Sequence, residues 1–254
     1  MALIFLHNLL DPIQPKTFGQ FAWLWQLLHV PGLIPVAPQR GIFLSLYVLV
    51  PWVGVMAAGY AFGALLKIEA ERRRRAMWMI GTAATVLFIL LRATNFYGNP
   101  AVGFPGSGKF VPQASVAMTV VAFLNVCKYP PSLQFLLMTL GPGVLALAIF
   151  DRVRTATNAA ARALVVFGRV PFFYYVLHIY TAHLLTVAIA VIYHQPFKRV
   201  FNGNFILSPP EPGYGHGLAF IYAVWIGMNI ALYFPCRWYA EYKRTHRQWW
   251  LSYV

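Results

Sequence analysis

The sequence predicts an all-α, polytopic transmembrane helical bundle that forms a single domain over residues 1–254. Two observations lead to this prediction. Of all residues, 59% are hydrophobic and only 10% are charged, which is a membrane composition. The apolar residues also come in long blocks, whereas a soluble core shows short alternations. Since a spanning helix needs about 20 apolar residues, we expect about five complete spans, a partial N-terminal helix and one interfacial or re-entrant helix.

Five long apolar blocks give the expected spans in chain order. They lie near 41–66, 76–93, 133–150, 163–193 and 217–239. Small residues along the first block permit close helix packing. The apolar segment 114–127 has only about half the length of a span, so we expect the interfacial or re-entrant helix there. Pro130 and Pro131 end this segment, and Ser132 is placed to cap the next span.

The distribution of cations predicts the orientation. The net charge is +14, but the cations form short clusters between apolar blocks, which favours anionic lipid over nucleic acid as the partner. Alternating sides along the spans divide the cations into groups of 13 and 7. The larger group comprises Lys67, Arg72 to Arg75, Arg152, Arg154, Arg162, Arg169, Arg237, Lys243, Arg244 and Arg247. By the positive-inside rule, we expect a multi-pass protein of the cell (inner) membrane with a cytoplasmic C-terminus and outward loops at 11–40, 96–131 and 194–216.

His178 is the first candidate catalytic residue, because ionisable side chains inside membrane segments are costly and usually face the bundle interior. Tyr174 and Tyr175 lie about one turn before it. A neutral imidazole there can act as a general base or orient a substrate hydroxyl or amine, and we place Tyr174 in the substrate site. The alternative is a structural histidine that bonds to a neighbouring helix.

His7 and Asp11 form the second catalytic candidate. Their spacing places them on one face of an α-helix, with Asn8 beside them as a substrate-binding residue. A carboxylate can fix the tautomer of an imidazole, as catalytic histidines require. Because Pro12 follows Asp11, the helix is expected to end there, and the alternative is an aspartate that contacts only solvent.

His29 and Lys128 are two further candidates for substrate binding. His29 follows Trp23 and Trp25 in an outward loop, a pattern that is also typical of an aromatic belt at the membrane interface. Lys128 can pair with an anionic group, or its side chain can extend to the lipid headgroups. The four arginines from 72 to 75 can contact a phosphate-bearing donor, or anionic lipid as a topology signal.

No metal site is predicted. His178 and His183 are five residues apart, which turns them about 140° from each other on an α-helix. Metal-binding pairs on a helix need three or four residues between positions. The sequence also contains no phosphate-binding loop, zinc-protease, nucleophile-elbow or dinucleotide motif, which removes support for ATP-driven transport and soluble hydrolase chemistry.

Several strings resemble a known family when they are taken together and in order. They are HNLLD at 7–11, LHVPG at 28–32, VPWVGVMAAGYAFG at 50–63, FLNVCKYPPSLQFLLMTLGP at 123–142 and GRVPFFYYVLHIYTAH at 168–183. The chain resembles the bacterial DUF1624 membrane proteins, relatives of heparan-α-glucosaminide N-acetyltransferase in the transmembrane acyltransferase group. Members have further spans before the HNLLD string, so we expect this chain to be the C-terminal portion of a larger acyltransferase-like domain.

The resemblance implies transfer of an acetyl group from cytoplasmic acetyl-coenzyme A to the amine or hydroxyl of a sugar on the outer side. A histidine in the bundle would serve as the base or as a transient acyl carrier. Two other hypotheses stay open. In a transporter or permease, the histidines would line a path together with Asn95, Asn125 and Asn229; alternatively, the chain is an inactive fragment. The sequence also leaves open a homo-oligomer.

Overall fold

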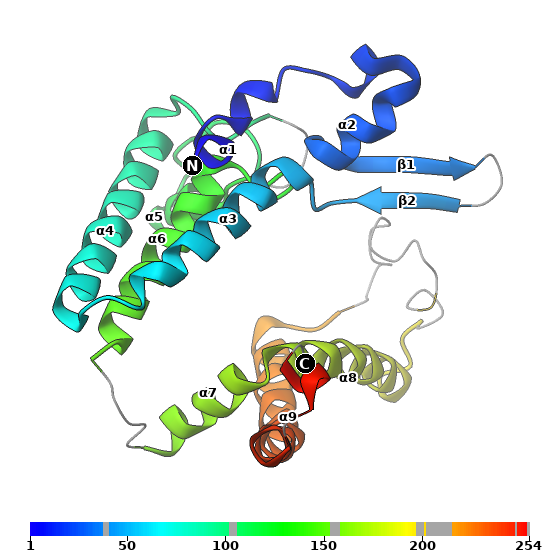
Figure 1. Cartoon of the computed structure of the whole chain (residues 1–254). Helices are drawn as coiled ribbons and strands as arrows, with labels where there is room; N and C mark the ends of the chain where they lie inside the picture. The colour runs from blue at the N-terminus through cyan, green and yellow to red at the C-terminus, as the bar shows by residue number, and fades with distance from the viewer. Residues whose placement is uncertain are drawn as a thin grey trace. The chain divides into compact units, whose positions relative to one another are not determined.

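The computed structural model describes residues 1–37, 41–101, 106–152, 158–196, 201, 215–246 and 248–252. These residues form two compact units, Met1–Val153 and Arg154–Val254. We describe each unit by itself (Figure 1). The predicted helical membrane class is confirmed, because four helices in the described part of the chain are long and apolar enough to cross a bilayer.

Unit 1 begins with short elements and ends with a long helical pair. Its elements are α1 (Ala2–Phe5), η1 (His7–Leu10), η2 (Pro15–Phe21), α2 (Ala22–Leu28), β1 (Gly32–Ala37), β2 (Gly41–Ser45), α3 (Leu49–Leu65), α4 (Ala70–Thr94), α5 (Val116–Leu124) and α6 (Leu133–Phe150). Strands β1 and β2 form an antiparallel hairpin in which Gly32 faces Ser45 and Leu33 faces Leu44. The short helix expected in segment 114–127 is present as α5, and Ser132 caps α6 as predicted.

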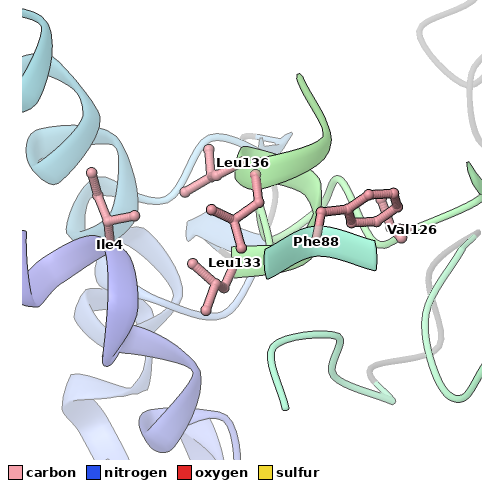
Figure 2. Packing of buried hydrophobic residues seen from close by; sticks show 6 residues of the cluster. Ile4, Phe88, Val126, Leu133 and Leu136 are labelled. Atoms are coloured by element: carbon pink, nitrogen blue, oxygen red, sulfur yellow. The ribbon is translucent and has the colours of Figure 1, made fainter. Parts of the chain in front are cut away.

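Helices α4 and α6 pack closely along most of their length (Figure 1). Glycines permit the contact: a Cβ atom on Gly81 would lie 2.8 Å from Leu145, and one on Gly141 would lie 2.7 Å from Thr85 Oγ1. Around this pair the apolar core gathers Ile4, Phe88, Val126, Leu133, Leu136 and Leu137 (Figure 2). Residues from both ends of the unit's sequence therefore share one core.

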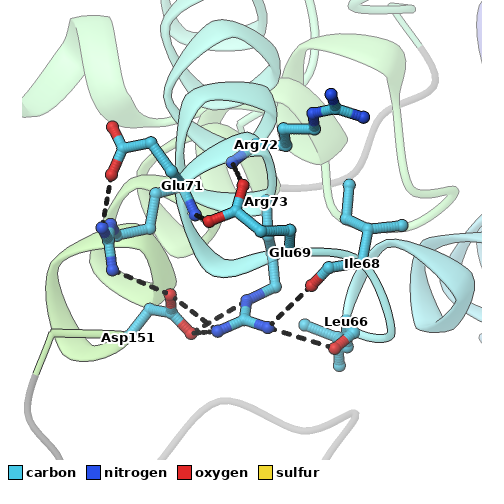
Figure 3. A network of polar contacts seen from close by, with 8 residues as sticks. Leu66, Ile68, Glu69, Glu71, Arg72, Arg73 and Asp151 are labelled. Atoms are coloured by element: carbon cyan, nitrogen blue, oxygen red, sulfur yellow. Dashed lines mark hydrogen bonds and ion pairs between the residues drawn. The ribbon is translucent and has the colours of Figure 1, made fainter.

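The far end of this helical pair is held by charge. Arg73 at the start of α4 donates from Nη2 to Asp151 Oδ1, at 2.7 Å, and from Nε to the same carboxylate (Figure 3). Its Nη1 also reaches the carbonyl oxygens of Leu66 and Ile68. Glu69 caps α4 by accepting from the backbone N–H groups of Glu71 and Arg72. The cation cluster predicted in this connection thus also joins the start of α4 to the end of α6, through Arg73 and Asp151.

The first predicted span, 41–66, is wrong at its N-terminal end. Residues Gly41–Ser45 are strand β2, and the helix begins only at Leu49. Short apolar runs fit a strand as well as a helix, and here pairing with β1 satisfies the backbone groups. Helix α3 therefore has 17 residues, while the small residues within it act as predicted at Gly54, which contacts Leu3 of α1.

Unit 2 contains α7 (Ala159–Arg169), α8 (Pro171–Ile192), α9 (Leu218–Thr245) and η4 (Trp249–Ser252). The predicted span 163–193 is therefore two helices. They separate at Val170, whose ψ angle of 50° is not helical, because a proline disfavours the α conformation of the residue before it. Pro171 then occupies a first-turn position, which suits its fixed φ angle. Val170, Cys236, Tyr239, Ala240 and Leu251 form the buried cluster of this unit.

Candidate functional site

Four of the residues that the sequence singled out meet in unit 1. Asp11, just after η1, lies at the centre, and its carboxylate has two side-chain partners. His29 donates from Nε2 to Asp11 Oδ1 at 2.9 Å, and Asn8 donates from Nδ2 to Asp11 Oδ2 at 2.9 Å. The His29 side chain is fully buried, whereas that of Asp11 is 15% exposed. The buried imidazole is thus held by a carboxylate that still faces open space.

This geometry defines the tautomer of His29. An ionised carboxylate only accepts hydrogen bonds, so the Nε2 atom that contacts Asp11 carries the proton. Nδ1 of the neutral ring then has a free lone pair, and it has no hydrogen-bond partner among the described residues. The ring lies 5.3 Å from that of Trp25, whose Nε1 donates to the carbonyl oxygen of Ile13. His29 therefore shares with a general base the carboxylate that orients its ring, while its unpartnered Nδ1 is itself buried.

The pairing of His7 with Asp11 that was predicted from the sequence is wrong. The prediction assumed an α-helix, but residues 7–10 form a 3₁₀ turn with three residues per turn. Asn8, three residues before Asp11, is therefore the one that faces the carboxylate. His7 is 2% exposed, and its Nδ1 and Nε2 atoms lie 2.9 and 3.0 Å from the carbonyl oxygens of Ile4 and Pro131. Burial lowers the pKa of His7.

Asn8 and His7 also attach this turn to the start of α6. Asn8 Oδ1 accepts from the backbone N–H of Leu133 at 2.9 Å, and the His7 ring contacts the carbonyl oxygen of Pro131. The rings of His7 and His29 lie edge to face with centroids 6.1 Å apart. The N-terminal turn, the end of α2 and the start of α6 are thus joined at one place, although they lie far apart in the sequence.

Two cavities open beside Asp11. The larger, of about 540 Å³, includes Asn8, Asp11, His29 and Pro130 in its lining. The smaller, of about 280 Å³, is lined by Asn8 and Asp11 and by the polar residues Asn95, Asn99, Lys109 and Gln134. Because Asn8 and Asp11 belong to both linings, the carboxylate is accessible from either cavity. Such concave, partly polar spaces are the usual location of small-molecule sites.

Sequence reasoning missed Gln134 and Asn99 as site residues. Gln134 is 1% exposed, donates to the carbonyl oxygen of Tyr97 at 2.9 Å, and leaves Oε1 without a partner among the described residues. Asn99 accepts from the backbone N–H of Cys127 at 2.8 Å and donates to the carbonyl oxygen of Gly108. The available signals were an amide inside an apolar block and an Asn-Pro turn.

Arg92 has a structural role that the sequence analysis did not anticipate. Its guanidinium is 3% exposed and donates to the carbonyl oxygens of Gly108, Ala122, Phe123 and Asn125. Three of these carbonyls belong to the last turn and cap of α5, where a cation is favourable. Arg92 therefore fixes α5 and the loop that lines the smaller cavity.

His178 and Tyr174 lie in unit 2. The two rings stack with centroids 5.3 Å apart, and His178 Nδ1 lies 3.3 Å from the carbonyl oxygen of Tyr174. Tyr174 donates through its hydroxyl to Asn229 Oδ1 at 2.8 Å. The bond between Tyr174 and Asn229 joins α8 to α9, whereas the hydrogen bond and the ring stacking of His178 lie within its own helix. The catalytic and the structural alternatives for His178 therefore both stay open.

Lys128 is exposed, and its Nζ lies 5.1 Å from the centroid of the Tyr129 ring. It is not among the lining residues of either cavity. In the described part of the chain, no three His, Cys, Asp or Glu side chains lie together as a metal site would require. Cys127 and Cys236 are both free and buried thiols.

We compared the chain with models of protein families, with curated proteins and with solved structures, and no match was found in any of the three.

Proposed function

We propose that the chain is part of a transmembrane acyltransferase, in which the cavity beside Asp11 binds the acceptor and His29 is the general base. The observation that supports this proposal is the 2.9 Å hydrogen bond between His29 Nε2 and Asp11 Oδ1 in the lining of an open cavity. The pair resembles the orienting carboxylate and base of acyl-transfer enzymes. It also lies in HNLLD and LHVPG, two of the strings that resemble the DUF1624 proteins.

The proposed step uses the free lone pair of His29 Nδ1, an atom that is buried in this structure and that must become accessible to the acceptor. Nδ1 takes the proton from the N–H or O–H group of the acceptor while the acceptor forms a bond to the acyl carbon. The bond between the acyl carbon and its leaving group breaks, and the leaving group takes the proton from the imidazolium. Asp11 stabilises that imidazolium through the existing hydrogen bond. Asn8 holds the second carboxylate oxygen, so Asp11 stays in place during the step.

The two ends of unit 1 suit two different substrates. The cavity lies where α4 ends and α6 begins, whereas Arg72 and Arg75 lie at the opposite end of α4, which has 25 residues and is about 37 Å long. Arg72 and Arg75 are exposed and form no ion pair with a described residue. We therefore place the sugar acceptor at the outer cavity, and infer that Arg72 and Arg75 make the first contact with the phosphates of acetyl-coenzyme A on the cytoplasmic side, before its acetyl group moves toward the cavity.

The test uses the full chain in proteoliposomes with labelled acetyl-coenzyme A enclosed and glucosamine outside, since glucosamine offers both an amine and hydroxyls. Labelled N- or O-acetyl glucosamine should appear outside with the wild-type chain. His29→Gln should remove at least about 99% of the initial rate. The matched control is His178→Gln, which should keep the rate within about twofold because His178 lies in unit 2 and does not line either cavity.

Two results would contradict the proposal. The first is the absence of labelled product from a wild-type chain whose helical circular dichroism and gel-filtration profile show that it is folded. The second is product formation that His178→Gln removes and His29→Gln leaves unchanged. Entry of unmodified glucosamine in the absence of acetyl-coenzyme A would favour a transporter. Of the three asparagines expected to line its path, Asn95 bonds to Phe110 and lines the smaller cavity, and Asn229 bonds to Tyr174.

A further inference from the structure

One end of unit 2 gathers cations and tryptophans around a single buried cluster. Val170 and Cys236 are fully buried there, and Leu251 joins them from η4. The cluster fixes the junction of α7 and α8, the last turns of α9 and η4 next to one another. We call this region the basic end of unit 2; it comprises Arg162, Arg169, Arg237, Lys243, Arg244, Trp238, Trp249 and Trp250.

Cations outnumber carboxylates among the described residues of the basic end. Glu241 is the single carboxylate in the described part of unit 2, and it forms an ion pair with Arg244. Arg169 and Arg237 are exposed and form no ion pair with a described residue, although both lie within electrostatic range of Glu241. They adjoin Val170 and Cys236 in the sequence, so the buried cluster places the two residues at the same end of the unit. Two exposed arginines at one end of the unit are available to an external anion.

The length of α9 places the basic end at the surface of a bilayer. The helix has 28 residues and is therefore about 42 Å long, whereas the hydrocarbon core is about 30 Å thick. Part of the helix therefore extends beyond the hydrocarbon, and its last turns, which carry Lys243 and Arg244, are the part that the headgroup level favours. Trp238 and Trp249 are 63% and 80% exposed there, and tryptophan is enriched at that level.

Helix α7 has the properties of an interfacial helix. It has 11 residues, which is too short to cross the hydrocarbon core. Leu164 is 69% exposed and Val165 is 43% exposed, while Arg162 and Arg169 are exposed along the same helix. A short helix that exposes both leucine and arginine is typical of a segment that lies in the plane of the interface.

We propose that the basic end of unit 2 binds the headgroup phosphates of anionic phospholipids, with Arg169 and Arg237 as the main ligands and α7 lying in the interface. A guanidinium group can donate two parallel hydrogen bonds to a phosphate, which a single ammonium group does less well. Charge complementarity selects an anionic lipid, and the exposed tryptophans select a lipid over a free phosphate ion. This inference stands independently of the proposed function.

The test is native mass spectrometry of the full chain in mild detergent, with phosphatidylglycerol or phosphatidylcholine added at equal concentration. The wild-type chain should retain phosphatidylglycerol preferentially. Each of Arg169→Gln and Arg237→Gln should weaken phosphatidylglycerol retention about fivefold, and the double variant should remove the preference. The matched control is the double variant Lys16→Gln, Lys109→Gln, which removes two exposed cations from unit 1 and should keep the preference.

Circular dichroism and gel filtration establish that each variant is folded. Equal retention of the two lipids by the wild-type chain would overturn the proposal. So would a double arginine variant that keeps the wild-type preference, or displacement of phosphatidylglycerol by millimolar inorganic phosphate, which would identify a free-anion site instead of a lipid site.

Discussion

His29 donates a 2.9 Å hydrogen bond to Asp11, which lies 18 residues earlier in the chain, and the bond joins the end of α2 to the turn after η1. The imidazole is fully buried and the carboxylate is partly exposed to two cavities. A buried base that is oriented by an accessible carboxylate is a common element of active sites.

Replacing Asp11 by Asn tests whether the carboxylate sets the tautomer of His29. The amide has nearly the same shape, but it does not stabilise an imidazolium. We expect the rate of acetyl transfer to fall between about 100-fold and 10,000-fold while the chain stays folded. The measurement is the initial rate in the proteoliposome assay, with Lys128→Gln as a control that should leave the rate unchanged. A rate for Asp11→Asn within twofold of wild type would remove Asp11 from the mechanism.

His7 predicts a pH dependence of stability. Burial lowers its pKa in the folded chain, so the unfolded chain binds the proton more readily. The stabilising contribution is therefore present above the unfolded pKa, about 6.5, and is lost as pH falls through the folded pKa. The unfolding temperature in detergent should decrease from pH 7.5 to pH 5.5, and by less in His7→Gln. Equal decreases in the two proteins would show that His7 is not the group responsible.

Replacing Gly141 tests whether the close approach of α4 and α6 requires a residue without a side chain. A Cβ atom there would lie 2.7 Å from Thr85 Oγ1 and 2.9 Å from Thr85 N, so Gly141→Ala should destabilise the chain by about 1–3 kcal/mol. Gly143 on the same helix has no atom within 4 Å of its Cβ position. Gly143→Ala should therefore be neutral or stabilising by up to about 1 kcal/mol. Denaturant titrations followed by circular dichroism compare the two, and equal effects would contradict the packing described here.

Replacing Arg92 tests how much its hydrogen bonds to α5 and to the loop beside the smaller cavity stabilise the chain. Arg92→Met keeps the length and apolar contacts of the side chain but leaves four carbonyl groups without their donor, which should cost about 2 kcal/mol or more. Arg75→Met removes an exposed cation of the same helix and should change stability by less than about 0.5 kcal/mol. Thermal unfolding in detergent measures both. If Arg92→Met were as stable as Arg75→Met, the four hydrogen bonds of Arg92 would not contribute to stability.

The sequence was most informative where it contained a long apolar block or a residue with a specific capping role. Five spans were predicted, and four of them contain helices long enough to cross a bilayer, whereas the first contains the shorter helix α3. These four helices and the cap at Ser132 were predictable because apolar length and capping chemistry act locally. The β1–β2 hairpin was missed, since a short apolar run does not distinguish strand from helix. The break at Val170 had a visible signal in Pro171, but the length of the apolar block outweighed it.

The candidate site was predicted in its residues but not in its pairing. Asp11, Asn8, His7 and His29 were all singled out, yet the partner of Asp11 depends on a tertiary contact between η1 and α2. Periodicity could not reveal the 3₁₀ turn that directs Asn8, instead of His7, toward Asp11. Gln134 was missed for a similar reason, because its position beside a cavity depends on the loop that Arg92 and Asn99 fix.

The most direct test of the central claim is a double-mutant cycle on Asp11 and His29 in the acetyl-transfer assay. If the two residues act as one unit, the variant that carries both Asp11→Asn and His29→Gln should be no slower than His29→Gln alone. Asp11 acts only through His29, so once His29 is replaced the further loss of Asp11 has no effect on the rate. Losses that multiply, or a double variant with the wild-type rate, would contradict a catalytic pair at this cavity.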